Sequence, residues 1–358
     1  MKEIRFNGYG KSPGKLYLAG EYAVTLPGQP SIIMAVDRFV TVNLDPRTDA
    51  LISVTSNLLG HRELSSSELL TVAFDDDWRL VLRTLQLIQT YAIENGQPFT
   101  GLTVSIDSQL TMAGQKLGLG SSAAVVMALI KAYVALSELP MSSIQQYKLG
   151  ALATLTTPNF KAGSMGDLAA ATFGGIIRYQ KFASPVIFDW LDQHRYVSEM
   201  LAATWPDLVI EPLALPADWS LLVGWTGSPA DTQALLESGD LTDRDAAKQL
   251  LAQNTAPLVG MIETGLRQAD FDKVRAAMQL SQEQLFAYAS RVGLAYVTPA
   301  LLSLLSIATE AGAGAKISGA GGGDNGIALT NDATVATAMR DAWQRAGITP
   351  LPLAIAFN

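Results

Sequence analysis

Nine residues, Lys116-Leu-Gly-Leu-Gly-Ser-Ser-Ala-Ala124, decide how this chain is interpreted. Two glycines precede two serines, and the serines open a long stretch of strong helix formers that stops before Pro140. Glycine lets a backbone approach an anion closely, and the free N–H groups and dipole of a helix N-terminus favour negative charge. Ser121 and Ser122 can cap the helix or bind Mg²⁺, and Lys116 adds a cation beside the loop. The pattern predicts a phosphate-binding loop, although an ordinary glycine turn with a serine cap has the same sequence.

Two further segments carry unusual residues. Ser318-Gly-Ala-Gly-Gly-Gly-Asp-Asn-Gly326 runs directly into the apolar strand residues Ile327–Leu329, whereas a flexible linker would continue into polar sequence. Such a turn suits close approach to a ligand or to another backbone. Pro13-Gly-Lys-Leu-Tyr-Leu-Ala-Gly-Glu-Tyr-Ala-Val24 places a lysine on a strand and a glutamate just after a turn, where both can face one cleft. Taken alone, this segment fits an edge-strand lysine and a solvated glutamate better than a site.

Composition limits the classes of function. The chain has 358 residues, with 25 Lys+Arg against 33 Asp+Glu, a net charge of −8, 49% hydrophobic residues and no cysteine. This length favours two domains, and the acidic balance argues against broad nucleic-acid binding. Without cysteine there is no disulfide, thiolate nucleophile, zinc–thiolate site or Cys-ligated cluster. His61 and His194 lie in polar connecting sequence, which does not favour a Ser-His-Asp hydrolase.

The chain also lacks sequence signals for export or membrane insertion. Met1–Gly14 is polar and punctuated by glycine and proline, unlike a signal peptide, and the apolar run Ala123–Ile130 is too short to span a bilayer. We therefore expect a cytoplasmic protein that binds neither membrane nor nucleic acid. Gly10-Lys11-Ser12 resembles the end of a Walker A loop, but Arg5 stands where its first glycine belongs. Gly118–Ala123 matches a dinucleotide fingerprint, but the preceding strand ends about a dozen residues too early.

Helices and strands are mixed along the whole chain, which predicts an α+β or α/β protein. The predicted strands are Lys15–Ala19, Ile32–Leu44, Leu102–Ile106, Ile176–Tyr179, Ser220–Trp225, Gly326–Leu329 and Leu351–Ala356. The predicted helices are Ser67–Glu94, Ser121–Leu139, Ser142–Leu155, Gly163–Phe173 (starting near Met165), Thr242–Leu266, Phe271–Val292, Thr298–Glu310 and Asp332–Ala346. We expect Asp107–Lys116 to be a loop. Prolines interrupt Gln193–Trp219, so we place the domain boundary there, between residues 195 and 196.

In chain order, the three segments resemble the signature motifs of the galactokinase, homoserine kinase, mevalonate kinase and phosphomevalonate kinase (GHMP) superfamily. The resemblance covers nearly the whole chain, and within the superfamily it is strongest to the bacterial phosphomevalonate kinases. Four stretches carry this narrower resemblance: Gly14–Val24, Ala35–Thr41, Gly163–Ala169 and Gly224–Ala230.

The resemblance implies an α+β fold of two domains, residues 1–195 and 196–358. The first would be similar to the second domain of ribosomal protein S5, and the second would be ferredoxin-like. It implies ATP- and Mg²⁺-dependent phosphorylation of 5-phosphomevalonate to 5-diphosphomevalonate, by a monomer or homodimer. Lys15 and Asp167 would be catalytic. ATP phosphates would bind at Lys116, Gly118, Leu119, Gly120, Ser121, Ser122 and Ala123, with Mg²⁺ on Ser121 or Ser122. The acceptor would meet Tyr17, Glu21, Tyr22, Arg38, Ser164, Ser318, Gly319, Ala320, Gly321 and Gly322.

Departures from the motifs of mevalonate kinases favour a phosphorylated acceptor. Those enzymes usually have His at the position of Tyr22, Pro near Lys116 and a further Gly at Asp324. Lys15, Arg38 and Lys116 would hold two phosphate-bearing substrates together despite their repulsion. Asn325 replaces a common Cys, and we expect this departure to leave the function intact, because neither a role nor a charge depends on it. A mevalonate kinase or a diphosphomevalonate decarboxylase of the same fold remains the alternative.

Overall fold

The computed structural model describes residues 8–112, 114–137, 140–160, 163–227 and 243–357. Parts of five sequence predictions therefore lie outside the described residues. They are the start of the N-terminal segment at 1–7, position 113 of the Asp107–Lys116 loop, the helix end at Leu139, positions 228–230 of the Gly224–Ala230 stretch and the helix start at Thr242.

The first structural unit is built on a seven-stranded sheet. Its strand order is β4-β3-β5-β2-β8-β9, and β1 pairs antiparallel with β2 along almost its whole length. The strands are β1 Gly8–Ala19, β2 Pro30–Arg47, β3 Leu51–Ser56, β4 Gly60–Ser65, β5 Gly101–Ser108, β8 Ile176–Gln180 and β9 Val209–Leu213. A small separate hairpin, β6 Thr111–Met112 and β7 Gln115–Lys116, precedes helix α3.

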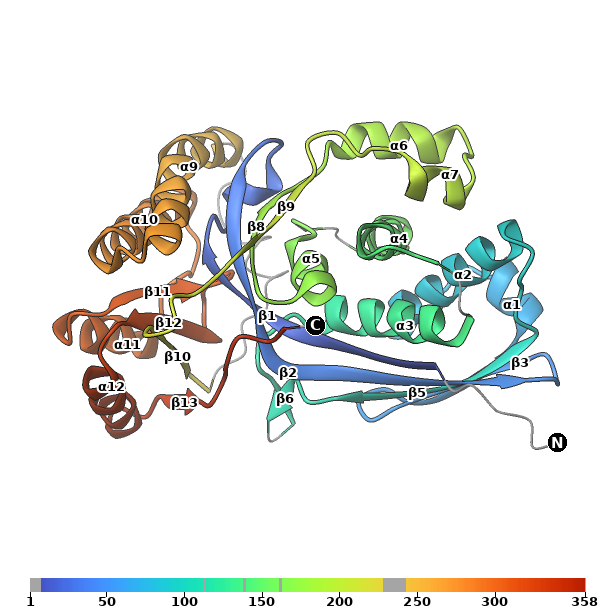
Figure 1. Cartoon of the computed structure of the whole chain (residues 1–358), viewed down its shortest axis with the longest axis horizontal. Helices are drawn as coiled ribbons and strands as arrows, with labels where there is room; N and C mark the ends of the chain where they lie inside the picture. The colour runs from blue at the N-terminus through green and yellow to red at the C-terminus, as the bar shows by residue number, and fades with distance from the viewer. Residues whose placement is uncertain (1–7, 113, 138–139, 161–162, 228–242, 358) are drawn as a thin grey trace.

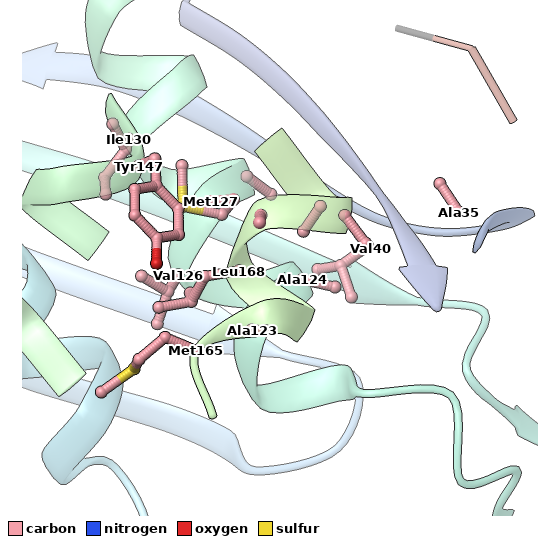
Figure 2. Close-up of a cluster of buried hydrophobic side chains, with 14 of the residues drawn as sticks. Ala35, Val40, Ala123, Ala124, Val126, Met127, Ile130, Tyr147, Met165 and Leu168 are labelled. Atoms are coloured by element: carbon pink, nitrogen blue, oxygen red, sulfur yellow. The ribbon is translucent and has the colours of Figure 1, made fainter. Parts of the chain in front are cut away.

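Helices cover one face of this sheet (Figure 1). They are α1 Ser66–Thr71, α2 Arg79–Glu94, α3 Ser121–Ser137, α4 Ser143–Thr156, α5 Gly166–Phe173, α6 Ser184–Asp192 and α7 Val197–Ala202. Helix α3 lies directly on β1 and β2 and also packs against α2, α4 and α5. Figure 2 shows the resulting core, in which Val126 and Met127 of α3 meet Tyr147 of α4 and Leu168 of α5. Burial on so many sides explains why α3 is apolar around nearly its whole circumference.

The second unit has a four-stranded sheet with the order β11-β12-β10-β13. Its strands are β10 Ser220–Trp225, β11 Gly314–Ser318, β12 Asn325–Thr330 and β13 Thr349–Leu351. Its helices are α9 Arg244–Gln268, α10 Phe271–Val292, α11 Pro299–Glu310 and α12 Ala333–Arg345. Helices α11 and α12 cover one sheet face around Trp343, while α10 packs on β11 at the other face and α9 lies beside α10 and also contacts the first unit (Figure 1). The predicted α+β fold of two units is therefore confirmed.

The chain changes from one sheet to the other between residues 213 and 220, because β9 still pairs with β8 whereas β10 belongs to the second sheet. It then returns at its C-terminal end. Ile355 bridges to Val36 and Phe357 bridges to Gly174, so the last residues lie beside the first sheet (Figure 1).

Two predicted elements differ from the structure. The single helix expected over Ser67–Glu94 is two helices, because a capping box of Ser65 and Glu68 starts α1 and Val72 already has extended backbone angles. The strand expected over Leu351–Ala356 ends at Leu351, and the following residues form only isolated bridges with the first sheet. The expected Asp107–Lys116 loop contains the β6–β7 hairpin. Prediction missed β3, β4, β9, β11, α6 and α7 altogether.

Across the described part of the chain, no helix combines the length and the apolar character that crossing a membrane requires.

Candidate active site at the free edge of strand β1

The three sequence segments meet at one edge of β1. The other edge of this strand is paired with β2, so the N–H groups of its free edge need partners from elsewhere. The Lys15 N–H donates to the Leu119 carbonyl oxygen at 2.8 Å. The Tyr17 N–H donates to Ser318 Oγ at 2.8 Å, and Ser318 Oγ donates back to the Tyr17 carbonyl at 3.0 Å. Residues about one hundred and three hundred positions apart are thereby fixed to a single strand.

The glycine loop before α3 faces the side chains of Lys15 and Asp167. Gly118 and Gly120 have φ of +68° and +79°, which is the left-handed region that favours glycine. A Cβ on Gly120 would lie 3.1 Å from Lys15 Cγ and 3.7 Å from Asp167 Cβ. Helix α3 begins at once with the pair Ser121–Ser122, of which the first is half-buried and the second exposed. Open backbone N–H groups thus lie next to a lysine, which suits an anion.

Lys15 lies among three carboxylates. Burial lowers the pKa of its ammonium group, while Asp167, Asp324 and Glu21 act in the opposite direction. Its Nζ donates to the Gly118 carbonyl oxygen at 3.4 Å, a long hydrogen bond that leaves the ammonium group beside the glycine loop. The lysine is thus a partly desolvated cation, for which an anionic ligand would be a strong partner.

A chain of hydroxyl groups fixes the loop before α5, the helix whose first turn carries Asp167. Ser164 Oγ lies 2.6 Å from the Tyr17 hydroxyl and accepts from the Gly166 N–H at 3.2 Å. The Tyr179 hydroxyl donates to the Ser164 carbonyl oxygen at 2.7 Å. Burial raises the pKa of the Tyr17 hydroxyl, so this group stays protonated. Asp167, in the first turn of α5, is therefore set on a rigid support beside Lys15.

Two tyrosines hold the second glycine-rich segment. The Tyr22 hydroxyl donates to the Ala320 carbonyl oxygen at 2.5 Å, and the Gly322 N–H donates to the Tyr296 carbonyl oxygen at 2.7 Å. Gly321 has φ of +74°, and a Cβ there would lie 2.1 Å from the Tyr296 ring. Only glycine fits at this position, because the ring closes over the backbone.

Four of the residues predicted for the site have side chains without a contact to Lys15 or Asp167 among the described residues. The side chains of Leu119 and Ala123 are buried in the core, so only their backbone can meet a ligand. Lys116 is exposed on β7, and Arg38 is half-buried on β2. Neither cation forms a hydrogen bond or ion pair with another described residue.

Sequence reasoning missed two residues that connect the second unit to the glycine loop. The Asp324 side chain packs against Gly118, where a Cβ would lie 2.4 Å from Asp324 Cγ. Its carbonyl oxygen accepts from the Thr226 N–H at 2.9 Å. Asn325 is 1% exposed, and its Nδ2 donates to the Leu117 carbonyl oxygen at 2.6 Å. Asn325 thus supplies a buried hydrogen bond that holds the loop to β12.

Lys316 is the third residue that was missed. It is fully buried, and its ammonium group is ion-paired with Glu21 from the first unit. The available signal was a single lysine between the small and apolar residues of Gly314–Ser318. The predicted site residue Glu21 is consequently buried and faces Lys316.

Within the described residues, no group of three or more His, Cys, Asp or Glu side chains could hold a metal ion. A cation at this site would therefore depend on ligand oxygens together with few protein groups. The Ser121–Ser122 pair, Asp167 and Asp324 carry side-chain oxygens close to the glycine loop and Lys15.

Comparison with known proteins identifies both units. Residues 79–175 match the family model described as "GHMP kinases N terminal domain", and residues 262–349 match the one described as "GHMP kinases C terminal". A phosphomevalonate kinase of a Streptomyces species is 37% identical, over 96% of this chain and 95% of its own length. A phosphomevalonate kinase of Saccharolobus solfataricus is 29% identical over 94% of both chains.

Solved structures agree with this assignment. The phosphomevalonate kinase of Streptococcus pneumoniae, solved in complex with phosphomevalonate and AMPPNP, superposes with a TM-score of 0.85 and 26% sequence identity. The superposition covers 97% of this chain and 99% of that one, so both units and their mutual arrangement correspond.

Proposed function

The chain belongs to the phosphomevalonate kinases of the GHMP kinase family, and from that premise we propose that it transfers the γ-phosphoryl group of ATP to (R)-5-phosphomevalonate. The products are (R)-5-diphosphomevalonate and ADP, a step of the mevalonate pathway of isoprenoid biosynthesis. The enzyme is thus a phosphotransferase whose acceptor is itself a phosphate group.

One observation carries the residue-level proposal: the side chains of Lys15 and Asp167 both lie beside Gly120 of the glycine loop. In this proposal ATP phosphates bind the N–H groups of residues 118–123 at the start of α3, where the helix dipole favours negative charge. Lys15 contacts the transferred group and neutralises the charge that develops in the transition state.

Asp167 orients Lys15 in this proposal and is not required as a base. The acceptor is a phosphate monoester with a second pKa of about 6, so its attacking oxygen is mostly deprotonated at neutral pH. Phosphoryl transfer then depends on positioning and charge neutralisation. The support for an orienting role is that Asp167 raises the pKa of Lys15 against the effect of burial.

The acceptor pocket lies between β1 and the second glycine-rich segment in our proposal. Tyr17, Ser164 and Ser318 form its hydrogen-bonded wall, and Glu21 and Tyr22 hold residues 319–322 over it. Lys116 and Arg38 supply positive charge at its margins. Because neither cation has a partner among the described residues, both are available to an anionic substrate.

Mg²⁺ is the expected companion of ATP, and the residues present fit it. A bound Mg²⁺ usually keeps several waters and takes one or two protein oxygens together with substrate phosphates. The hydroxyls of Ser121–Ser122 can provide such an oxygen. The ion would neutralise phosphate charge, whereas Lys15 and the α3 N-terminus do so from the protein itself.

Three coarser properties complete the proposal. We propose that the limit between the two domains lies at the change of sheet between residues 213 and 220, later than the expected limit between 195 and 196, because α7 and β9 pack in the first unit. We propose that the enzyme works in the cytoplasm as a monomer or homodimer.

An ADP-release assay with three candidate acceptors tests the function. We expect kcat/KM for phosphomevalonate to exceed the value for mevalonate by at least about 100-fold, since a site built for a charged group discriminates strongly against an acceptor that lacks it. Comparable values for both acceptors would refute the assignment in favour of a small-alcohol kinase. ADP release with diphosphomevalonate, accompanied by CO₂, would identify a decarboxylase.

A further inference from the structure

Lys316 is a charged side chain in a place where charge is costly. It lies on β11, is 0% exposed, and its ammonium group contacts Glu21 Oε1 and donates to the Ile317 carbonyl oxygen at 2.6 Å. Burial lowers its pKa, and the Glu21 carboxylate opposes that effect. A buried ion pair gives little net stability, because desolvation consumes most of the Coulombic gain. Stability alone therefore does not explain why the Lys316–Glu21 ion pair lies between the two units.

Glu21 connects this ion pair to the second glycine-rich segment. It follows β1 in the turn before the short helix η1 Ala23–Thr25, and it is 4% exposed. Its Oε1, which faces Lys316, also lies 3.5 Å from the Gly319 N–H. Its Oε2 has no hydrogen-bond partner among the described residues. One carboxylate oxygen thus meets both a buried ammonium group and the first glycine N–H of the segment.

Glu21 is one of three residues after Leu16 that contact the second glycine-rich segment, and their contacts follow the same order along both stretches of chain. Tyr17 holds Ser318 by two hydrogen bonds, Glu21 meets Gly319, and Tyr22 holds Ala320. Gly319 has φ of +93°, and a Cβ there would meet no atom within 4 Å. At Gly319 the segment is therefore held by Glu21, and the space beside this residue is open to a substrate.

We propose that Lys316 is a positioning residue: its ion pair with Glu21 fixes the Gly319–Gly323 backbone over the acceptor without touching a substrate. This inference deepens the proposed function, on which its kinetic part rests. Lys316 anchors the Glu21 carboxylate, and the carboxylate orients the Gly319 N–H. Displacement of this backbone by about 1 Å would disturb near-attack geometry and lower turnover by a factor of up to ~100.

The decisive variant removes the charges and keeps the packing. In Glu21→Leu/Lys316→Met, two apolar side chains of similar volume replace the pair, which is commonly neutral or stabilising. We expect a thermal midpoint at or above that of the wild type, but faster hydrogen exchange at residues 317–323. We also expect at least a ~10-fold loss of kcat/KM for phosphomevalonate, with little change in ATP affinity. A double variant with wild-type exchange and wild-type kinetics would overturn the proposal.

Glu21→Gln is the second measurement, in case the double variant does not fold. It keeps the side-chain shape and leaves Lys316 unpaired, so it should lower the thermal midpoint by roughly 10 °C and accelerate the same exchange. The single variant Lys316→Arg retains a cation opposite Glu21, so it should keep the wild-type protection of residues 317–323 against exchange. Unchanged exchange in folded Glu21→Gln protein would contradict the proposal.

A matched control distinguishes this ion pair from contact between the units in general. Arg178 of β8 pairs with Glu263 of α9 at 3.2 Å, which also joins the two units but does not touch the glycine segment. Arg178→Met should leave hydrogen exchange at residues 317–323 and kcat/KM unchanged. If it changed both as much as Glu21→Leu/Lys316→Met does, a specific role for Lys316 would be refuted. If the wild type fails to phosphorylate phosphomevalonate, the proposed function fails, while the exchange measurements still test the positioning.

Discussion

Lys15 shows how one residue obtains its chemistry from its surroundings. Burial makes its charge less favourable, and Asp167, Asp324 and Glu21 each make it more favourable. The three carboxylates thus favour the charged ammonium form in a place with little solvent, although burial lowers the pKa overall. A cation in this condition interacts more strongly with a developing negative charge than a solvated lysine does.

Removing that cation should affect turnover more than nucleotide binding. We expect Lys15→Met to lower kcat roughly 100-fold or more, because its charge is needed chiefly in the transition state. The affinity for a non-hydrolysable ATP analogue, measured by calorimetry, should change little, since the N–H groups of residues 118–123 remain. Lys11→Met is the control, because Lys11 lies on the same strand over the Phe39 ring, away from the site. A nearly unchanged kcat would show that Lys15 is not at the transfer point.

Asp324 should influence the alkaline limit of activity. Lys15 acts as a cation, so activity falls as pH rises through its pKa, which already lies below 10.5. Asp324 raises this pKa, and Asp324→Asn should therefore move the alkaline limb of kcat/KM to lower pH. Phosphate groups with a pKa of about 6 do not titrate in this range. Profiles from pH 7 to 10.5 check this, and an alkaline limb that stays in place would exclude Lys15 as the titrating group. Asp272→Asn, on the surface of α10, should leave the profile unaltered.

At the scale of elements, the site depends on how closely α3 and its glycine loop approach β1. Gly120 and Gly114 both have φ of +79°, but they differ in what surrounds them. A Cβ on Gly120 would meet Lys15, whereas a Cβ on Gly114, in the β6–β7 turn, would meet no atom within 4 Å. Substitutions at these two positions therefore impose the same backbone strain, but only a substitution at Gly120 also obstructs the site.

Gly120→Val should abolish most turnover, and Gly114→Val should not. Both variants force a β-branched residue into the left-handed region, at a cost of roughly 1–3 kcal/mol in folding free energy. Only Gly120→Val displaces Lys15 and blocks the close approach of a phosphate. Denaturant unfolding should give similar losses of stability for both, while kcat and ATP affinity should fall only for Gly120→Val. Wild-type activity of that variant would mean that the loop is an ordinary turn.

The sequence was sufficient where the periodicity of a segment is clear. Helix α10 has the predicted limits Phe271–Val292, because its apolar residues repeat at helical spacing and Asp270 and Gly293 cap its ends. The break between α1 and α2 was missed, since apolar spacing continues across it and only local capping ends α1. Strand β4, with the sequence Gly60–Ser65, was missed because most of it is polar and it lies at the edge of the sheet.

The candidate site was predictable to the extent that its chemistry lies in short motifs. The glycine loop, Lys15 and the second glycine-rich segment were all identified, and the structure brings them together at β1. The partnership of Lys316 with Glu21 could not be predicted, because it joins residues 295 positions apart and depends on how the two units pack. The same holds for Asn325 and Leu117, whose hydrogen bond is a product of tertiary structure.

At the scale of the whole molecule, the chain end ties the units together behind the site. The Ala356 N–H donates to the Ala35 carbonyl oxygen at 3.0 Å, and the Gly175 N–H donates to the Ala356 carbonyl oxygen at 2.6 Å. Ala35 is the register partner of Lys15 in the β1–β2 pair, and Gly175 follows the helix that carries Asp167. The end of the second unit thus supports both proposed catalytic residues from behind.

Deleting residues 353–358 tests whether this support matters for catalysis. The deletion removes the buried side chains of Leu353 and Ala356 and leaves backbone groups of Ala35 and Gly175 unpaired. The thermal midpoint should fall by roughly 5–10 °C. At a temperature well below the thermal midpoints of the wild type and the truncated enzyme, kcat should also be lower for the truncated enzyme. The reason is that the deletion releases the strand behind Lys15 and the end of α5 together. Phe357→Ala is the control, since that side chain is 79% exposed, and it should change neither quantity. A truncated enzyme with a lower midpoint and unchanged kcat would show that the chain end stabilises the fold without positioning Lys15 or Asp167.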